Sequence, residues 1–376
     1  MVANKSATTV PLTSVENPKR LLSLDFLRGF IMVLLALESA RLFEGLLHVA
    51  KGSFLEKILQ QFFHHPWNGL YFWDLIQPGF MYIAGVALAL SLLKQQSAGM
   101  EWMQSFKKIA VRCAWLFFLG ILTYAVQPEG LLLRFTNVLT QLSITLLITF
   151  FIFYWSFAAQ IIMCIGLLLL TEILYRYTNI PGFDEPFTNQ QNFGNYVDFL
   201  LSGQMIPDGW TSINCIPTAV HTIAGSLTGK LVMSSQNKLK PIFIWGLACI
   251  ILGIGLDLTG VTPVIKRIAT SSFTLVSLGI CLLAYVACYW WIDVRRHQKY
   301  LGFFIIVGMN SIFIYLFFEI VGARWFNDHV FALVIGLSNM IYIPVAVSTI
   351  VASLCIFTLE WRLCYFLYRK QIFLRI

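Results

Sequence analysis

Residues 71–93 read YFWDLIQPGFMYIAGVALALSLL, and this segment decides the fold class. Asp74 is its only charged residue. At a rise of about 1.5 Å per residue, a helix of this length spans the hydrocarbon layer of a bilayer, which is about 30 Å thick. A helix also satisfies its own backbone hydrogen bonds, which lipid cannot do. The segment therefore predicts a transmembrane helix.

The whole chain has the same character. Of its 376 residues, 58% are hydrophobic and only 12% are charged, which excludes an ordinary soluble protein. We predict an all-α integral membrane protein, with a polar tail at 1–20 followed by one transmembrane domain at 21–376. Apolar runs broken by charge, Pro and Gly predict about ten transmembrane helices, at 24–43, 71–93, 108–126, 136–153, 157–175, 214–233, 241–258, 269–291, 301–321 and 341–367. The fourth and fifth come from one apolar stretch, which we expect to fold back near residues 154–156.

The basic residues predict the orientation. With the N-terminus in the cytoplasm, roughly two-thirds of the 26 Lys and Arg residues fall in cytoplasmic segments, as the positive-inside rule requires. Both termini are then cytoplasmic, and the segments 62–74 and 177–213 lie outside. We attribute the net charge of +8 to these basic loops and not to a nucleic-acid partner. The eight cysteines form no C-x-x-C pair, so neither a disulfide framework nor a metal site is predicted.

The first predicted helix carries ionisable residues, which mark functional or paired positions inside a membrane. Asp25 and Arg28 are three residues apart and can form an ion pair that merely fixes the helix. Glu38 and Ser39 lie about 20 Å further along the helix, in its outer part. Glu38 is either a partner of Arg41 or a carboxylate that orients or deprotonates a histidine.

Two histidines stand in the outer segment FFHHPWNGLYFWD (62–74). Pro66 disfavours a helix at His65 and predicts a turn that leads into the second transmembrane helix. Because histidine exchanges a proton near neutral pH, either His64 or His65 is a candidate general base, with Asp74 nearby in the sequence. The alternative is an interfacial anchor, in which the neighbouring aromatic residues form part of an aromatic belt and the histidines face water.

Two further polar residues and a basic cluster have both a functional and a structural interpretation. His221 and Asn310 can face a central cavity or can serve as buried packing and hydrogen-bonding groups. The cytoplasmic basic residues can be topology signals or can hold the phosphates of a nucleotide-like donor; they are Lys107, Lys108, Arg112, Arg295 and Arg296. No P-loop, G-x-G-x-x-G, H-E-x-x-H or G-x-S-x-G motif is present, which argues against ATP-driven transport, dinucleotide chemistry and zinc or serine hydrolysis.

Several segments together resemble one family. RLLSLDFLRG (20–29) is similar to the R-x-x-S-x-D-x-x-R-G opening of the transmembrane acyltransferases related to heparan-α-glucosaminide N-acetyltransferase. HHPWNGLYFWDLIQPGFMYIAGVAL (64–88) is similar to that family's H-x-x-W-N-G-L-x-x-x-D-L-x-x-P segment. The resemblance continues through Pro217, 266–294, 307–315 and the end of the chain. It implies a bacterial-type member of the family, which is a multi-pass protein of the inner (cytoplasmic) membrane.

The resemblance implies transfer of an acetyl group from cytoplasmic acetyl-CoA to a sugar or glycan on the far side of the membrane. The motif histidine falls on His64 and not on His65, and Asp25, Arg28 and Asp74 also fall on motif positions.

Two positions depart from the family's pattern. Ser39 stands where an Asn is usual, and Gln141 stands where the fourth-helix pattern has a second Arg. These departures leave a changed acceptor or a lost activity open.

We therefore expect His64 to act as general base or transient acyl carrier, with Glu38 or Asp74 setting its tautomer and Ser39 beside them. The residues expected to bind the acceptor are Trp67, Asn68, His221 and Asn310, and Asn310 is also a candidate donor to the oxyanion. Those expected to hold acetyl-CoA are Asp25, Arg28, Lys107, Lys108, Arg112, Arg295 and Arg296.

The alternatives are a secondary transporter for a sugar or a non-catalytic scaffold of the same fold. The oligomeric state stays open.

Overall fold

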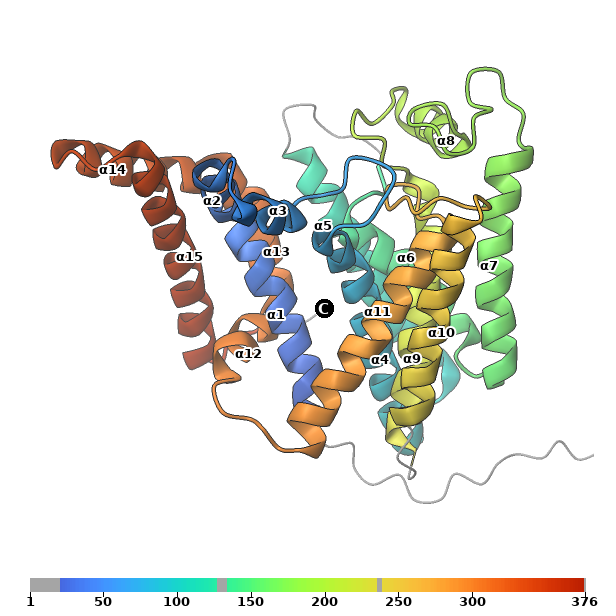
Figure 1. The fold of residues 1–376 in the computed structure, drawn as a ribbon. Coiled ribbons are helices and arrows are strands. Elements are labelled where there is room, and N and C mark those ends of the chain that lie inside the picture. The colour runs from blue at the N-terminus through green and yellow to red at the C-terminus, as the bar shows by residue number, and fades with distance from the viewer. Residues whose placement is uncertain (1–20, 127–133, 235–238, 375–376) are drawn as a thin grey trace, which may run out of the picture.

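The computed structural model describes residues 21–126, 134–234 and 239–374, and every regular element within these ranges is a helix (Figure 1). The long helices are α1 (Leu22–Ser39), α4 (Ile76–Ser97), α5 (Trp102–Ala125), α6 (Val138–Ile152), α7 (Phe157–Tyr177), α9 (Cys215–Met233), α10 (Leu239–Leu258), α11 (Ser271–Tyr289) and α15 (Val345–Arg369). The shorter elements are α2 (Leu42–Ala50), α3 (Phe54–Leu59), η1 (Gln60–Phe62), η2 (Phe72–Leu75), α8 (Phe193–Ser202), η3 (Ser212–Asn214), η4 (Trp290–Val294), α12 (Gly302–Met309), α13 (Ser311–Phe317), η5 (Phe318–Phe326) and α14 (Asn327–Met340).

The predicted membrane class agrees with the helices. Within the described ranges, seven helical segments are long and apolar enough to cross a bilayer: Phe72–Ser97, Trp102–Ala125, Phe157–Tyr177, Leu239–Leu258, Ser271–Val294, Ser311–Met340 and Val345–Arg369. The protein is therefore a multi-pass integral membrane protein. Three other predicted spans also form helices, namely α1, α6 and α9, and they pack against the seven. The reversal predicted near 154–156 is confirmed, because α6 ends at Ile152 and α7 begins at Phe157.

One predicted span was wrong. The segment 301–321 was expected to be a single helix, but it is interrupted at Asn310, between α12 and α13. The Asn310 side chain binds the C-terminal segment there, donating to the carbonyl oxygen of Ile372 at 3.0 Å and accepting from the N–H of Leu374 at 3.2 Å. Beyond the break, helical structure continues through η5 and α14 to Met340, and α14 extends sideways from the bundle (Figure 1).

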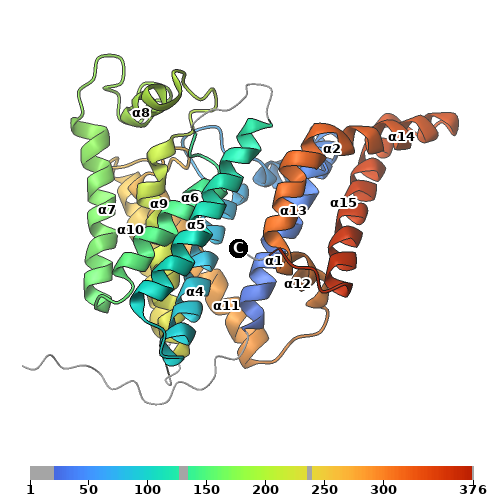
Figure 2. The same ribbon diagram turned by 180° about the vertical axis from the view of Figure 1, so that it is seen from behind.

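The helices form two groups that stand side by side (Figure 2). One group holds α1, α2 and α12 to α15, and the other holds α4 to α11. Helices α1, α4 and α11 contact one another and join the groups. The N-terminus of α1 is fixed by Asp293 of η4, whose carboxylate accepts from the N–H groups of Leu22 and Ser23, both at 3.1 Å. An acidic side chain at this place satisfies two helix-end donors and complements the helix dipole.

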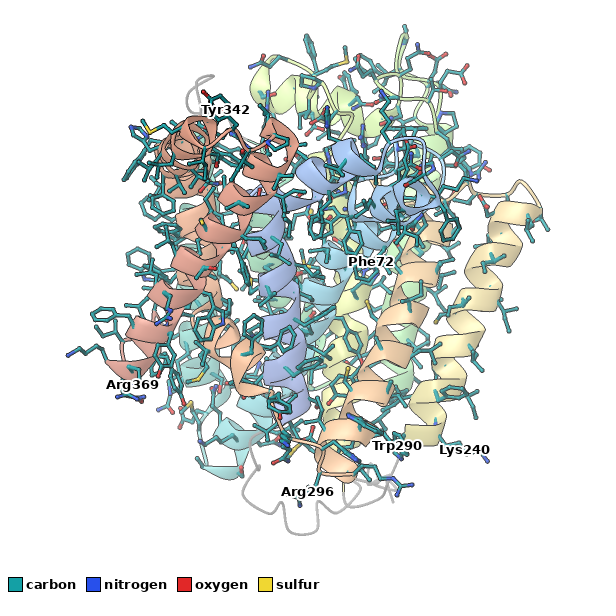
Figure 3. The ribbon with its side chains drawn as sticks, turned by 60° about the vertical axis from the view of Figure 1, so that its left-hand side comes forward. Phe72, Lys240, Trp290, Arg296, Tyr342 and Arg369 are labelled. Atoms are coloured by element: carbon teal, nitrogen blue, oxygen red, sulfur yellow. The ribbon has the colours of Figure 1, made fainter. Side chains whose placement is uncertain are left out.

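The two ends of the bundle differ in charge and in structure. Lys240, Arg296 and Arg369 lie at one end, and Phe72 lies toward the other (Figure 3). Helices α2, α3 and α8 gather at the end that carries Phe72, together with the segment 60–71 (Figure 1). This end therefore carries the histidine segment, and Lys240, Arg296 and Arg369 lie opposite to it.

The helices α4 and α9 cross at two glycines. A Cβ atom added at Gly85 would meet the carbonyl oxygen of Thr222, and one added at Gly225 would meet the carbonyl oxygen of Tyr82. Small residues allow this close approach of two backbones in a membrane bundle. The crossing holds α4, which begins just after Asp74, in a fixed place within the bundle.

We expect Gly85→Ala and Gly225→Ala each to lower the unfolding temperature of the purified protein, because the helices must separate at a cost of about 1–3 kcal/mol. Gly166→Ala in α7 is the matched control, since no atom lies within 4 Å of its added Cβ. Thermal unfolding in one detergent checks this. Equal unfolding temperatures for all three variants would show that the crossing is not tight.

Candidate functional site

The histidine segment is an irregular loop whose course depends on Pro66 and Gly69. The predicted turn at Pro66 is confirmed, since no regular helix lies between η1 and η2. Gly69 has φ of +140°, and an added Cβ would meet the imidazole ring of His65. Its N–H donates to the carbonyl oxygen of Val264 at 2.8 Å. The loop is thereby tied to the connection between α10 and α11.

Asp74 lies at the point where this loop enters the membrane helix. Its carboxyl group is 1% exposed. One oxygen, Oδ2, accepts from the N–H of Tyr71 at 2.8 Å and from the N–H of His65 at 3.3 Å. The other oxygen, Oδ1, lies 3.1 Å from Nδ1 of His64. Because two backbone donors hold Oδ2, the carboxylate has a fixed orientation toward His64.

Lys266 is the third member of this arrangement and was not predicted as a site residue. Its side chain is 6% exposed, and its Nζ lies 3.0 Å from Nδ1 of His64 and 3.5 Å from Oδ1 of Asp74. Burial lowers the pKa of Lys266 to about 8, although Asp74 opposes that shift. We call His64, Asp74 and Lys266 the His64 cluster. In the sequence, Lys266 was considered only as one of the basic loop residues that predict the orientation in the membrane. It nevertheless opens the segment 266–294, which resembles the acyltransferase family.

His64 is the open member of the cluster, with 38% of its side chain exposed. Partial burial lowers the pKa of His64, Asp74 opposes that shift, and Lys266 adds to it. The imidazole is therefore neutral at neutral pH. Among the described residues, its hydrogen-bond partners all face Nδ1, so Nε2 is the nitrogen available to a substrate.

The outer segment 177–213 reaches the cluster through two tryptophans. The indole N–H of Trp67 donates to the carbonyl oxygen of Phe187 at 2.8 Å, so Trp67 anchors this segment to the histidine loop. Trp210 packs edge-on against His64, with ring centroids 5.7 Å apart, and Nζ of Lys266 lies 5.0 Å from its ring centroid. Trp210 was also missed in the sequence, because nothing near it along the chain connects it to His64.

The segment 177–213 is fixed by Asp198 of α8. The Asp198 carboxylate is buried and accepts from the N–H of Ser212, at 3.1 and 3.3 Å to its two oxygens. Burial raises the pKa of Asp198 to about 6. The N–H of Thr211 donates to the carbonyl oxygen of Arg267 at 3.2 Å, one residue beyond Lys266. The segment therefore packs directly against the loop that supplies Lys266.

Glu38 lies near the cluster, and the proposed Glu38–Arg41 pair is not formed. Arg41 instead pairs with Asp328 at 3.0 Å. The Glu38 carboxylate interacts with the side chain of Trp73 and with the charge of Lys266. Its neighbour Ser39 accepts from the carboxamide of Asn327, at 2.8 Å to the carbonyl oxygen and 3.5 Å to Oγ.

Two of the predicted acceptor-binding residues, His221 and Asn310, are engaged elsewhere. His221 is fully buried, with Nε2 2.9 Å from Oγ of Ser277 and Nδ1 3.3 Å from the carbonyl oxygen of Thr218, which fits the packing interpretation. Asn310 binds the C-terminal segment, so its carboxamide is not directed at His64. Asn68 is exposed on the histidine loop.

A cavity of about 440 Å³ is lined by α1, α12 and α13 of one helix group and by α4, α5 and α6 of the other. Three charged residues line it: Asp25, Arg28 and Arg112. The predicted pair of Asp25 and Arg28 is confirmed at 3.9 Å. Nε of Arg112 has no hydrogen-bond partner among the described residues. Most of the remaining wall is apolar.

The remaining basic residues of the predicted donor site are not part of this wall. Lys107, Lys108, Arg295 and Arg296 are exposed, the first two on α5 and the last two just after η4. Of the five basic residues in the predicted cytoplasmic cluster, Arg112 is the one that lines the cavity together with Arg28.

Tyr315 and Glu38 connect the cavity to the His64 cluster. Tyr315 lines the cavity, and its hydroxyl accepts from the carboxamide of Asn137 at 3.1 Å. The charge of Glu38 acts both on Tyr315 and on Lys266. Glu38 therefore interacts electrostatically with one residue of each site.

Gln141, at the second departure from the family's pattern, is part of a buried chain of carboxamides. Gln77 donates to Gln141, Gln141 donates to Asn214, and Asn214 donates to the carbonyl oxygen of Arg267 at 3.3 Å. The neutral chain links α4 and α6 to the loop that carries Lys266.

We expect Asp74→Asn to destabilise the protein by about 3 kcal/mol, because the buried Lys266 ammonium loses its counter-charge. The matched control is Asp328→Asn, which breaks the exposed pair with Arg41 and should change stability by less than about 1 kcal/mol. Thermal unfolding of both variants measures the difference. Equal effects would mean that water reaches the His64 cluster freely.

Comparison with known proteins adds no assignment. No family model matches the chain, and no curated protein matches it. Among the described residues, no group of three or more His, Cys, Asp or Glu side chains is placed to hold a metal ion. The His64 cluster and the cavity are therefore the features from which a function can be inferred.

Proposed function

We propose that the protein is a membrane acyltransferase that moves an acetyl group from cytoplasmic acetyl-CoA to an amino or hydroxyl group of an extracytoplasmic sugar or glycan. The observation that carries this proposal is the His64–Asp74 pair. A buried, oriented carboxylate faces one ring nitrogen of a partly exposed, neutral histidine, and the other ring nitrogen is left for a substrate. This is the arrangement that a general base or a nucleophilic histidine requires.

The topology proposed is ten transmembrane helices with both termini in the cytoplasm. The seven long apolar segments supply most of these spans, and α1, α6 and α9 supply the others. The end with Lys240, Arg296 and Arg369 is then cytoplasmic, in keeping with the positive-inside rule (Figure 3). The histidine loop and the segment 177–213 face the other side, where the acceptor approaches.

The donor site proposed is the cavity between the helix groups. Its volume of about 440 Å³ suits part of a cofactor-sized ligand. Arg28 and Arg112 supply guanidinium groups for phosphate oxygens, and the apolar wall suits the pantetheine arm. The exposed basic residues at the same end, including Lys108 and Arg296, raise the local concentration of the anionic donor.

The reaction proposed is direct transfer assisted by His64. The acceptor's oxygen or nitrogen attacks the thioester carbonyl carbon while Nε2 of His64 takes its proton. The new C–O or C–N bond forms, the C–S bond breaks, and the CoA thiolate recovers the proton from the imidazolium. Asp74 stabilises the transient imidazolium through the hydrogen bond at Nδ1. An acetyl group carried briefly on Nε2 is the two-step version of the same chemistry.

The resemblance noted in the sequence gains support from this placement. Asp25 and Arg28 lie at the cavity, and His64 and Asp74 lie in contact at the outer loops. Four motif residues thus form two sites, each with a chemistry that acetyl transfer needs.

We expect His64→Ala to lower acetyl transfer by about 10²–10⁴-fold, because the proton acceptor is lost. His65→Ala is the matched control, since its ring packs on Tyr71 and only its backbone reaches Asp74. The assay is transfer from radiolabelled acetyl-CoA to a panel of amino sugars and glycans, with purified protein in nanodiscs.

The same assay separates the competing functions. Uptake of a sugar into proteoliposomes without acetylation would identify a transporter. Binding of CoA with neither acetylation nor uptake would identify a scaffold. Either result would overturn the acyltransferase proposal.

We expect Arg112→Gln to weaken acetyl-CoA binding by about tenfold or more, because a charged hydrogen bond to phosphate contributes about 1.5–3 kcal/mol. Lys240→Gln is the matched control, since Lys240 is exposed at the same end and does not line the cavity. Isothermal titration with acetyl-CoA measures both dissociation constants. Unchanged affinity in Arg112→Gln would remove the cavity as the donor site.

A further inference from the structure

Two groups of opposite charge contact the same nitrogen of His64. Oδ1 of Asp74 lies 3.1 Å from Nδ1, and Nζ of Lys266 lies 3.0 Å from it. Nδ1 carries either a proton, which it donates to Asp74, or a lone pair, which accepts from Lys266. The two partners also lie 3.5 Å from each other. The state of His64 therefore depends on both partners.

We propose that Lys266 is a positioning residue that balances the charge of Asp74, so that Asp74 orients His64 without keeping it protonated. A buried carboxylate alone beside an imidazole stabilises the imidazolium. An imidazolium has no lone pair for the acceptor's proton and is inactive as a base. The ammonium of Lys266 offsets this effect because it faces the same carboxylate oxygen.

The residues around Lys266 hold its ammonium group next to His64 and Asp74. Its side chain is almost fully buried, and Trp210 lies over the ammonium. The other charged groups near the cluster are Arg267 and Glu38. Arg267 donates to the carbonyl oxygen of Asp208, and its charge acts on both His64 and Lys266. Glu38 interacts with Lys266 from α1. Lys266 is thus the cation in direct contact with both His64 and Asp74.

The same balance favours completion of the proposed reaction. After His64 takes the acceptor's proton at Nε2, the imidazolium lies beside one anion and one cation. Asp74 holds the Nδ1 proton, and Lys266 makes the doubly protonated ring less stable. The ring therefore returns its proton to the departing CoA thiolate.

The test measures the protonation of His64 directly. Diethyl pyrocarbonate reacts with neutral imidazole, and mass spectrometry of peptides locates the modified residue; a His65→Gln background in all samples removes the neighbouring histidine. We expect Lys266→Met to raise the midpoint of the pH dependence of His64 modification by about one pH unit. Lys266→Arg should restore the midpoint. An unchanged midpoint in a folded Lys266→Met protein would overturn the proposal.

A second pair of variants covers a loss of folding in Lys266→Met. Asp74→Asn/Lys266→Met removes both buried charges and is compared with Asp74→Asn alone. If Lys266 acts by balancing Asp74, most of its effect on the midpoint disappears when Asp74 is neutral. If Lys266→Met shifts the midpoint of His64 modification equally with and without the Asp74 charge, Lys266 acts on His64 independently of Asp74. That result would overturn the proposal.

The catalytic meaning of this inference rests on the proposed acyltransferase function, and the two fail in different ways. If wild type transfers acetyl and the acid limb of kcat/KM is the same in Lys266→Met, the function stands and the role of Lys266 is wrong. If wild type transfers nothing but the modification midpoint shifts, the electrostatic role stands and the function is wrong.

Discussion

The burial of the Asp74 carboxylate is the constraint on which the rest of the site depends. A carboxylate that is 1% exposed must have its lone pairs satisfied and its charge offset. Two backbone N–H groups of the histidine loop satisfy one oxygen, which fixes the path of residues 65–71. The other oxygen faces His64 and Lys266. Because Lys266 belongs to the loop between α10 and α11, the same carboxylate joins two distant parts of the chain.

The sequence predicted the parts of this arrangement that lie close together along the chain. The turn at Pro66 and the entry into α4 follow from one short segment, and Asp74 is one of the two carboxylates that were expected to face His64. Lys266 and Trp210 were not predicted, because they reach His64 from 202 and 146 residues away and no local pattern marks such contacts. Sequence reasoning finds pairs on one helix, such as Asp25 and Arg28, more readily than pairs made by folding.

The helix predictions had a similar limit. Apolar runs located the long helices well, because lipid requires apolar length. The break at Asn310 was missed, since the residues around it, VGMNSIFIY, read as one apolar run. What opens the helix there is the binding of the Asn310 carboxamide to residues 372 and 374. The same applies to Ser39, whose carbonyl oxygen accepts from the carboxamide of Asn327 in α14, almost three hundred residues later.

A single helix relates the two proposed sites to each other. Arg28 lines the cavity, and Glu38, ten residues later in α1, interacts with Lys266. At a rise of about 1.5 Å per residue, Arg28 and Glu38 are about 15 Å apart along the helix axis. A rigid helix keeps this distance constant, so a donor whose phosphates stay at Arg28 can extend its acyl end toward His64. A transporter must instead alternate the access of one site between the two faces. Two different sites at fixed spacing, joined by α1, therefore favour transfer of a group over transport of a whole substrate.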